Sequence, residues 1–254
     1  MASKKTQLSK AAQARIKTYE ARSNEQESRS GLRKRDNRIA FFAGIAALAI
    51  AFGSQLGYAA LHPSASASPS ASAPAAANTG TVPNASLAEN RTWSGSLKLN
   101  DAALNFTLDG KKAPQAVANF VTLAKKGFYS GVSCHRVTTA GLYVLQCGDP
   151  KGDGSGGPGY SFGPIENAPK NNVYGEGVIA MARVGNNAAS QGSQFFIVYK
   201  DTTLGTDSAG GYTVFGKVTS GLQVVKAIAA AGTSDGSSDG KPKNKVTMTS
   251  VNVK

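Results

Sequence analysis

The chain has 254 residues, two cysteines and a formal net charge of +13. About 160 residues follow a polar linker, which is enough for a hydrophobic core and excludes a small scaffold that depends on disulfides or metals to fold. Residues 1–38 contain 11 Lys and Arg against four Asp and Glu, so they carry +7 of the charge. This uneven distribution disfavours a basic nucleic-acid-binding domain, and we expect no nucleic-acid partner.

The first segment is polar and basic. Lys, Arg, Gln, Ser and Glu dominate residues 1–38, and no periodic apolar face is present. We predict a basic cytoplasmic tail without a core of its own. Its side chains suit anionic lipid head groups, at about 1 kcal/mol for each basic residue near the surface, or a cytoplasmic partner. A solvated segment that sets the membrane topology is the simpler interpretation.

Residues 39–61 form a stretch of 23 residues without a charged side chain. A helix of that length crosses a hydrocarbon core of about 30 Å. Lys and Arg occupy residues 33–35 and 38, and no further Lys or Arg follows until Arg91. The positive-inside rule then predicts a single-pass signal-anchor helix in the plasma membrane, with the N-terminus cytoplasmic and the later residues extracytoplasmic. A buried soluble helix is one alternative. A cleaved secretory signal is another, because small residues follow at Ala65-Ser66-Ala67.

The next segment is a linker. Residues 62–89 consist largely of Ala, Ser and Pro with almost no charge. Such a composition buries too little apolar surface to offset the entropy lost on ordering. We predict a disordered tether over 62–89, followed by one monomeric domain over 90–254.

That domain opens with patterns of period two. Trp93–Leu99 and Leu104–Leu108 alternate apolar and polar side chains, which predicts half-buried antiparallel strands joined by a turn at 100–103. Val246–Val253 alternates in the same way and predicts a terminal strand. Many short strands separated by Gly-rich turns favour a mainly β fold that closes into a barrel.

Two helices are expected among these strands. Pro114 suits the first position of a helix, and an apolar stripe at residues 117, 120, 121 and 124 follows before Gly127 ends it. A second helix is predicted over Leu222–Ala231, with apolar residues 224, 225 and 228 facing inward and Gly232 at its end. A buried strand is the alternative for this second segment.

Six short motifs follow one another in the domain. They are Cys134-His135-Arg136-Val137, the run from Gln146 to Pro150, the run from Gly156 to Tyr160, Met181-Ala182-Arg183, the run from Gly192 to Ile197, and the run from Tyr212 to Val218. In this order they resemble the cyclophilins, a family of peptidyl-prolyl cis-trans isomerases, over roughly residues 93–254. The resemblance implies a closed eight-stranded antiparallel β-barrel with an α-helix covering each end.

The resemblance also implies roles for individual residues. Arg136 matches the catalytic arginine, which donates to the proline nitrogen as the amide bond twists, and Gln146 matches the glutamine that orients it. The substrate-binding positions are Phe196 as the floor of the proline pocket, Tyr143 and Val144 as its walls, and Ala182, Arg183, Gln194, Leu204 and Tyr212 around it. Arg183 stands where Asn is frequent, which adds a positive charge beside the peptide. This chemistry requires no metal and no cofactor.

The sequence therefore predicts a peptidyl-prolyl isomerase that assists the folding of exported or cell-envelope proteins. Its partners are proline-containing polypeptides and, through residues 39–61, the lipid bilayer. The order of the motifs suggests a bacterial, actinobacterial-like origin. One alternative is a membrane-tethered scaffold or chaperone that binds proline peptides with little turnover. Another is a protein whose main function lies in the basic tail.

The chain departs from the common family pattern at several positions. Two additional residues lie between His135 and Gln146, and Thr203 stands where cyclosporin-sensitive members often have Trp, which puts tight cyclosporin binding in doubt. We interpret His135 as structural, because alternation along a strand turns it away from Arg136. The same alternation separates Cys134 from Cys147, so we predict two free, buried thiols.

Overall fold

The computed structural model describes residues 78–254. The predicted tail (1–38), the predicted anchor (39–61) and residues 62–77 of the predicted linker lie outside the described part of the chain. Within residues 78–254, none of the helices has both the length and the apolar character required to cross a membrane.

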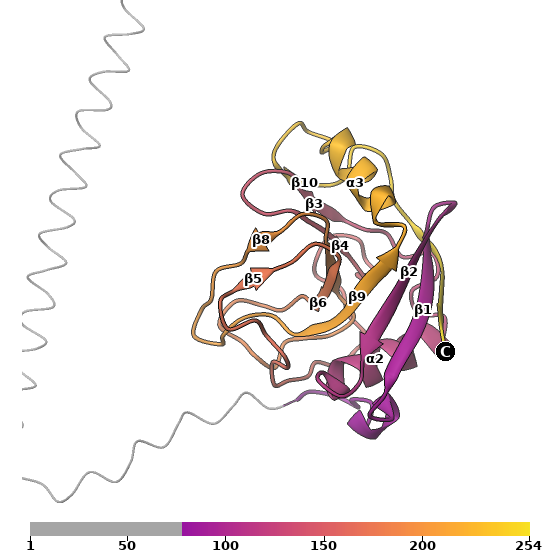
Figure 1. The fold of residues 1–254 in the computed structure, drawn as a ribbon, viewed down its shortest axis with the longest axis vertical. Helices are drawn as coiled ribbons and strands as arrows, with labels where there is room; N and C mark the ends of the chain where they lie inside the picture. The colour runs from indigo at the N-terminus through magenta and orange to yellow at the C-terminus, as the bar shows by residue number, and fades with distance from the viewer. Residues whose placement is uncertain (1–77) are drawn as a thin grey trace, which may run out of the picture. The chain divides into compact units, whose positions relative to one another are not determined.

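The fold is built mainly from antiparallel strands. Nine strands form one sheet in the order β10-β3-β4-β7-β6-β9-β2-β1-β11, and β5 pairs with β8 in a separate two-stranded sheet. The strands are β1 Thr92–Leu99, β2 Ala102–Asp109, β3 Arg136–Thr138, β4 Val144–Cys147, β5 Val173–Tyr174, β6 Val178–Met181, β7 Phe195–Val198, β8 Thr202–Thr203, β9 Val214–Ser220, β10 Asp239–Gly240 and β11 Met248–Val253. The large sheet curls around the core, as Figure 1 shows.

The hairpin of β1 and β2 confirms the period-two prediction. The two strands pair along their whole length, from Thr92 opposite Asp109 to Leu99 opposite Ala102. Their apolar side chains are buried on one face, as the alternation requires. The turn between the strands contains Asn100 with φ 53°, a left-handed conformation that Asn tolerates better than most residues.

The closure of the sheet differs from the expected eight-stranded barrel. The outermost strands β10 and β11 do not form a ladder with each other in the strand order of residues 78–254. Instead, the residues before β3 bond to the residues around the start of β11: the N–H of Cys134 donates to Val246 O at 2.9 Å, and the N–H of Gly131 donates to Met248 O at 2.8 Å. The sheet is therefore a curled half-barrel whose edges meet through irregular backbone.

Two α-helices lie at opposite ends of the curled sheet (Figure 1). α2 spans Pro114–Lys125, so it begins at the predicted residue and ends two residues before Gly127, and α3 spans Leu222–Ala231 as predicted. In α2 the predicted stripe is buried, and Phe120 packs against Phe106, Tyr129, Phe195 and Phe215. In α3, Val225 is fully buried, while the other two predicted inward residues are partly buried against the core.

The N-terminus of α2 is capped from a distant segment. Ala113 occupies the N-cap position and has no side chain able to accept a hydrogen bond. The carboxylate of Glu166 accepts the N–H of Gln115 and the N–H of Ala116, both at 3.0 Å. These N–H groups lack partners within the helix, and a negative charge also suits the positive end of the helix dipole. Glu166 therefore joins the loop after β4 to the helix.

The folded domain begins earlier than the predicted boundary at residue 90. Thr79 forms a β-bridge with Ser161, and a short 3-10 helix, η1, spans Ala85–Ala88. Ala88 is fully buried, and its carbonyl accepts a 2.9 Å bond from the indole N–H of Trp93. Residues 78–89, which we expected to belong to the linker, thus pack on the domain.

The cysteine prediction was wrong, because Cys134 and Cys147 form a disulfide. Cys147 ends β4, whereas Cys134 lies before β3, which begins at Arg136. The prediction extended strand alternation back to Cys134. In the structure, the backbone of Cys134 instead bonds to Val246, so the direction of its side chain does not follow the alternation of β3.

Candidate active site

Three adjacent strands carry the central polar residues. Arg136 on β3 lies opposite Gln146 on β4, and Gln146 lies opposite Phe196 on β7. Directly opposed residues of antiparallel strands project from the same face with their Cβ atoms about 4.5–5.5 Å apart. The strand register therefore brings the arginine, the glutamine and the phenylalanine together on one surface.

A chain of hydrogen bonds orders these side chains. Arg136 Nη1 donates to Gln146 Oε1 at 3.0 Å, and Gln146 Nε2 donates to Gln194 Oε1 at 2.9 Å. Gln194 Nε2 in turn donates to the carbonyls of Gly154 and Gly156, both at 2.9 Å. Each side-chain amide in this series accepts from one neighbour and donates to the next. The glycine loop therefore fixes the orientation of Gln194, Gln194 fixes that of Gln146, and Gln146 fixes that of Arg136.

A carboxylate that the sequence reasoning missed holds the other side of the arginine. Asp239 on β10 accepts Arg136 Nε at 2.7 Å and Nη2 at 2.8 Å, which is a bidentate ion pair. This hydrogen bonding raises the pKa of Arg136 above its ordinary value and lowers the pKa of Asp239 below its ordinary value. Because Asp239 lies 103 positions from Arg136 in a polar Gly- and Ser-rich segment, no local pattern indicated it.

The arginine keeps donors for a ligand. A guanidinium carries five N–H groups, one on Nε and two on each terminal nitrogen. Within the described residues, Nη1 uses one of them on Gln146, and Nη2 uses one on Asp239. One N–H on each terminal nitrogen is left for a ligand, and the Arg136 side chain is 36% exposed. Arg136 is thus an oriented cation with accessible donors.

An apolar surface adjoins this polar chain. A cluster separate from the main core contains Val144, Tyr174, Ala180, Phe196, Val198 and Leu204, with Ala182 and Tyr212 packed against it. The rings of Phe196 and Tyr212 meet edge to face with centroids 5.6 Å apart. The structure therefore brings together Val144, Ala182, Phe196, Leu204 and Tyr212 of the predicted pocket.

Tyr143 does not belong to this cluster. It packs against the main core, where its ring meets that of Tyr199 edge to face with centroids 5.9 Å apart, and Lys200 Nζ lies 4.4 Å from its ring centroid. Tyr143 immediately precedes Val144, and neighbouring residues along an extended strand project from opposite faces. Since Val144 faces the cluster, Tyr143 points away from it.

A polar cavity lies next to Gln146 and Gln194. Its volume is about 370 Å³, and its lining includes the glycine loop at 154–157, Ala182, Arg183 and Ser190. The predicted peptide-binding residues Ala182, Arg183 and Gln194 all border it.

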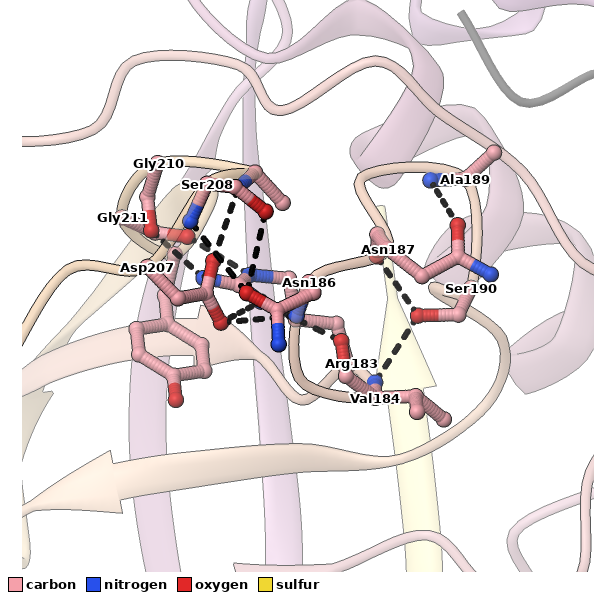
Figure 2. Close-up of polar contacts among 12 residues, drawn as sticks. Arg183, Val184, Asn186, Asn187, Ala189, Ser190, Asp207, Ser208, Gly210 and Gly211 are labelled. Carbon is pink, nitrogen blue, oxygen red and sulfur yellow. Dashed lines mark hydrogen bonds and ion pairs between the residues drawn. The ribbon is translucent and has the colours of Figure 1, made fainter. Parts of the chain in front are cut away.

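Arg183 does not supply the free positive charge that we predicted beside the peptide. Its side chain is 1% exposed and forms a bidentate ion pair with Asp207. Figure 2 shows this pair within a network that joins the loop at 184–190 to the loop at 207–211. The charge of Arg183 is therefore neutralised inside the protein.

His135 lies beside the arginine in sequence but not in the polar chain. It is partly buried, and burial lowers its pKa. Its Nδ1 is buried without a hydrogen-bond partner among the described residues. Burial thus favours the neutral form of His135, and among the described residues no hydrogen bond joins it to Gln146 or Gln194.

Comparison with known proteins identifies the family. The sequence profile described as cyclophilin type peptidyl-prolyl cis-trans isomerase matches residues 96–253. The chain therefore belongs to the cyclophilin-type peptidyl-prolyl cis-trans isomerase family. This match covers every strand except the first four residues of β1, both α-helices and every predicted site residue.

Curated relatives and solved structures agree with this assignment. The chain is 44% identical over 185 residues to the protein named "Probable peptidyl-prolyl cis-trans isomerase B" of Mycobacterium tuberculosis, a match that covers 68% of this chain and 57% of that protein. It is 43% identical to a peptidyl-prolyl cis-trans isomerase of Helicobacter pylori, covering 54% of this chain and 81% of that protein. The fold resembles a cyclophilin-type isomerase of Cryptosporidium parvum with a TM-score of 0.54 and 26% identity, over 65% of this chain and 98% of that one.

Proposed function

We propose that the protein catalyses the cis–trans isomerisation of X–Pro peptide bonds in polypeptides. The observation that carries this proposal is Arg136, which Asp239 and Gln146 hold from two sides while it keeps free N–H donors next to the Phe196 pocket. A related structure from Cryptosporidium parvum was solved in the presence of the dipeptide Ala-Pro, with a TM-score of 0.53 to this chain. That ligand supports proline peptides as the substrate class.

The size of the barrier defines what the site must supply. Rotation about a peptide bond has a barrier of about 18–20 kcal/mol because the bond has partial double-bond character. A turnover of about 10³ per second corresponds to a barrier near 13 kcal/mol. The protein must therefore lower the barrier by roughly 5–7 kcal/mol. Twisting removes the resonance and leaves a lone pair on the proline nitrogen, which is the feature that distinguishes the transition state.

Arg136 suits this feature because its remaining donors are oriented in advance. A charged donor that bonds to the nitrogen only in the twisted state stabilises the transition state selectively. Such a bond contributes about 1.5–3 kcal/mol. The rest comes from the apolar cluster around Phe196, which excludes water from the amide when the proline ring lies against it.

An isomerase assay tests the proposal directly. Cis-to-trans exchange of an Ala-Pro tetrapeptide is followed by NMR or by a protease-coupled reaction, with the full chain in detergent. We expect acceleration by the wild type and a loss of about 10- to 150-fold in kcat for Arg136→Ala, from the value of the lost bond. Unchanged kcat in a folded Arg136→Ala protein contradicts the role of the arginine.

We also propose that residues 39–61 anchor the protein in the plasma membrane and that residues 62–254 lie outside the cytoplasm. The uncharged stretch of 23 residues and the basic residues before it support this topology. The clients would then be proline-containing exported or cell-envelope proteins, and the similarity to mycobacterial proteins supports an actinobacterial origin. Alkaline phosphatase fused after residue 61 should be active and fused before residue 39 inactive. The reverse pattern contradicts the topology.

A second candidate is a proline-peptide-binding scaffold with little turnover. The packing of Tyr143 away from the pocket favours it, because one predicted wall is missing from the substrate surface. The two candidates differ in their response to Arg136→Ala. A scaffold retains its role in cells that carry this variant, whereas an isomerase loses it.

A further inference from the structure

Arg183 has no donor left for a substrate. Its Nε donates to the carbonyl of Gly211 at 2.8 Å, and its Nη1 donates to Asp207 at 2.8 Å and to Val184 O at 3.2 Å. Its Nη2 donates to Asp207 at 3.0 Å and to the carbonyl of Gly210. These bonds use all five N–H groups of a guanidinium. Any influence of Arg183 on the substrate must therefore pass through another residue.

Asp207 fixes the guanidinium in this position. Besides the two hydrogen bonds from Arg183, the carboxylate of Asp207 accepts the N–H of Asn186 at 2.8 Å and the N–H of Ala209 at 2.9 Å. The hydrogen bonds from Arg183 are the main reason that the pKa of Asp207 lies well below its usual range. Figure 2 shows both loops converging on the ion pair. The side chain of Arg183 is 1% exposed and that of Asp207 is 27% exposed, so the guanidinium is buried while its partner carboxylate lies nearer the surface.

Tyr212 connects the Arg183–Asp207 ion pair to the proline pocket. Two of the three carbonyls that accept from Arg183, those of Gly210 and Gly211, immediately precede Tyr212. The guanidinium carbon of Arg183 lies 4.6 Å from the centroid of the Tyr212 ring. The same ring meets Phe196 edge to face, so Arg183 contacts both the backbone before Tyr212 and the ring of a pocket wall.

We infer that Arg183 is a positioning residue that sets the affinity for the proline peptide by holding Tyr212 against Phe196. This inference rests on the proposed isomerase function for its kinetic readout. Among the described residues, no hydrogen bond or ion pair joins Arg183 or Asp207 to Arg136, so loss of the pair leaves the bonds of Arg136 to Asp239 and Gln146 in place. Loss of Arg183 should therefore raise KM more than it lowers kcat.

A double-mutant cycle tests this coupling in the full chain. Arg183→Met removes the bidentate ion pair with Asp207 and the positive charge, and Tyr212→Ala removes the aromatic ring. We expect Arg183→Met to raise KM about threefold to tenfold, from a cation–π contact whose strength lies between that of an exposed and that of a desolvated pair, with kcat within about twofold of wild type. In the Tyr212→Ala background the same substitution should change KM less than about twofold, because the residue through which it acts is gone.

The control and the second variant separate positioning from general stability. Arg91 lies 3.7 Å over the Trp93 ring and pairs with Glu89, away from the site, so Arg91→Met should leave KM unchanged. If Arg183→Met does not fold, Asp207→Asn takes its place in the cycle. An equal rise in KM with and without Tyr212, a fall in kcat alone, or no effect overturns the inference.

Failure of the isomerase function has a separate signature. Wild-type protein without isomerase activity refutes the proposed function. The cycle is then measured as dissociation constants for the same Ala-Pro tetrapeptide by NMR titration. Non-additivity between Arg183 and Tyr212 in peptide affinity supports the coupling, and additivity overturns it.

Discussion

Asp239 provides the sharpest prediction about catalysis, because it restrains Arg136 without lining the proline pocket. Asp239→Asn removes the charge and half of the bidentate contact. The pair is partly exposed, at 36% for Arg136 and 52% for Asp239, so the loss of folding stability should stay within about 1 kcal/mol. The larger effect should be that the Arg136 side chain becomes less ordered.

The magnitude follows from the freedom that Arg136 regains. An unrestrained arginine side chain carries about 2 kcal/mol of rotamer entropy, of which Gln146 still limits a part. A cost of about 1–2 kcal/mol in the transition state corresponds to a loss of about 5- to 30-fold in kcat. This loss is smaller than that expected for Arg136→Ala, because the donor itself remains.

The assay compares Asp239→Asn with a matched ion-pair variant. Glu176 pairs with Lys226 at 2.6 Å, and the two side chains are 45% and 48% exposed. Glu176→Gln should have a similar small effect on thermal unfolding and no effect on kcat. If Asp239→Asn also leaves kcat within about twofold of wild type, the reasoning about Arg136 is refuted.

The pH dependence of this contact has a defined direction. The folded-state pKa of Asp239 lies below the ordinary value of 3.8, chiefly because of its hydrogen bonds to Arg136. Its stabilising contribution is therefore fully present above about pH 4–5 and is lost as the pH falls through the lowered pKa. Between pH 5 and 8, roughly, the ratio of wild-type to Asp239→Asn kcat should be constant. A ratio that changes across this range contradicts the assignment.

Three further predictions concern stability and the pocket. Glu166→Ala should lower the free energy of unfolding by about 1–2 kcal/mol, since it uncaps α2, and Glu166→Gln by less; equal losses in urea titrations contradict the cap. Replacing Cys134 and Cys147 by Ala should lower the free energy of unfolding by about 2–4 kcal/mol, because the disulfide closes a loop with a sequence separation of 13. Thiol labelling of the denatured, non-reduced wild type should find no free thiol. Labelling of both cysteines contradicts the disulfide. Phe196→Leu should raise KM about twofold to tenfold with a stability loss below about 1.5 kcal/mol; an unchanged KM excludes Phe196 from the pocket.

Much of the fold is encoded locally and could be predicted. The alternation in β1 and β2 and the Pro114 start of α2 each depend on a few neighbouring residues. The closure of the sheet was not predictable in this way, because it depends on irregular backbone bonds between residues 131–134 and 246–248. Those bonds also account for the wrong prediction at Cys134, where strand alternation no longer applies.

The candidate site likewise combines residues that local motifs predict with partners that only the tertiary structure reveals. Arg136, Gln146 and Phe196 lie in recognisable motifs, and the strand register brings them together. Their partners Asp239 and Asp207 come from segments whose composition resembles ordinary polar loops. No spacing rule connects a carboxylate to an arginine 103 positions away, so only the tertiary structure reveals the pairing.

The measurement that tests the central claim most directly is the isomerase activity of the full chain in detergent, wild type beside Arg136→Ala. The account predicts rapid isomerisation by the wild type and a loss of about 10- to 150-fold in kcat for the variant, with similar thermal unfolding of the two proteins. A folded wild-type protein that does not accelerate the exchange, or a variant as active as the wild type, contradicts it.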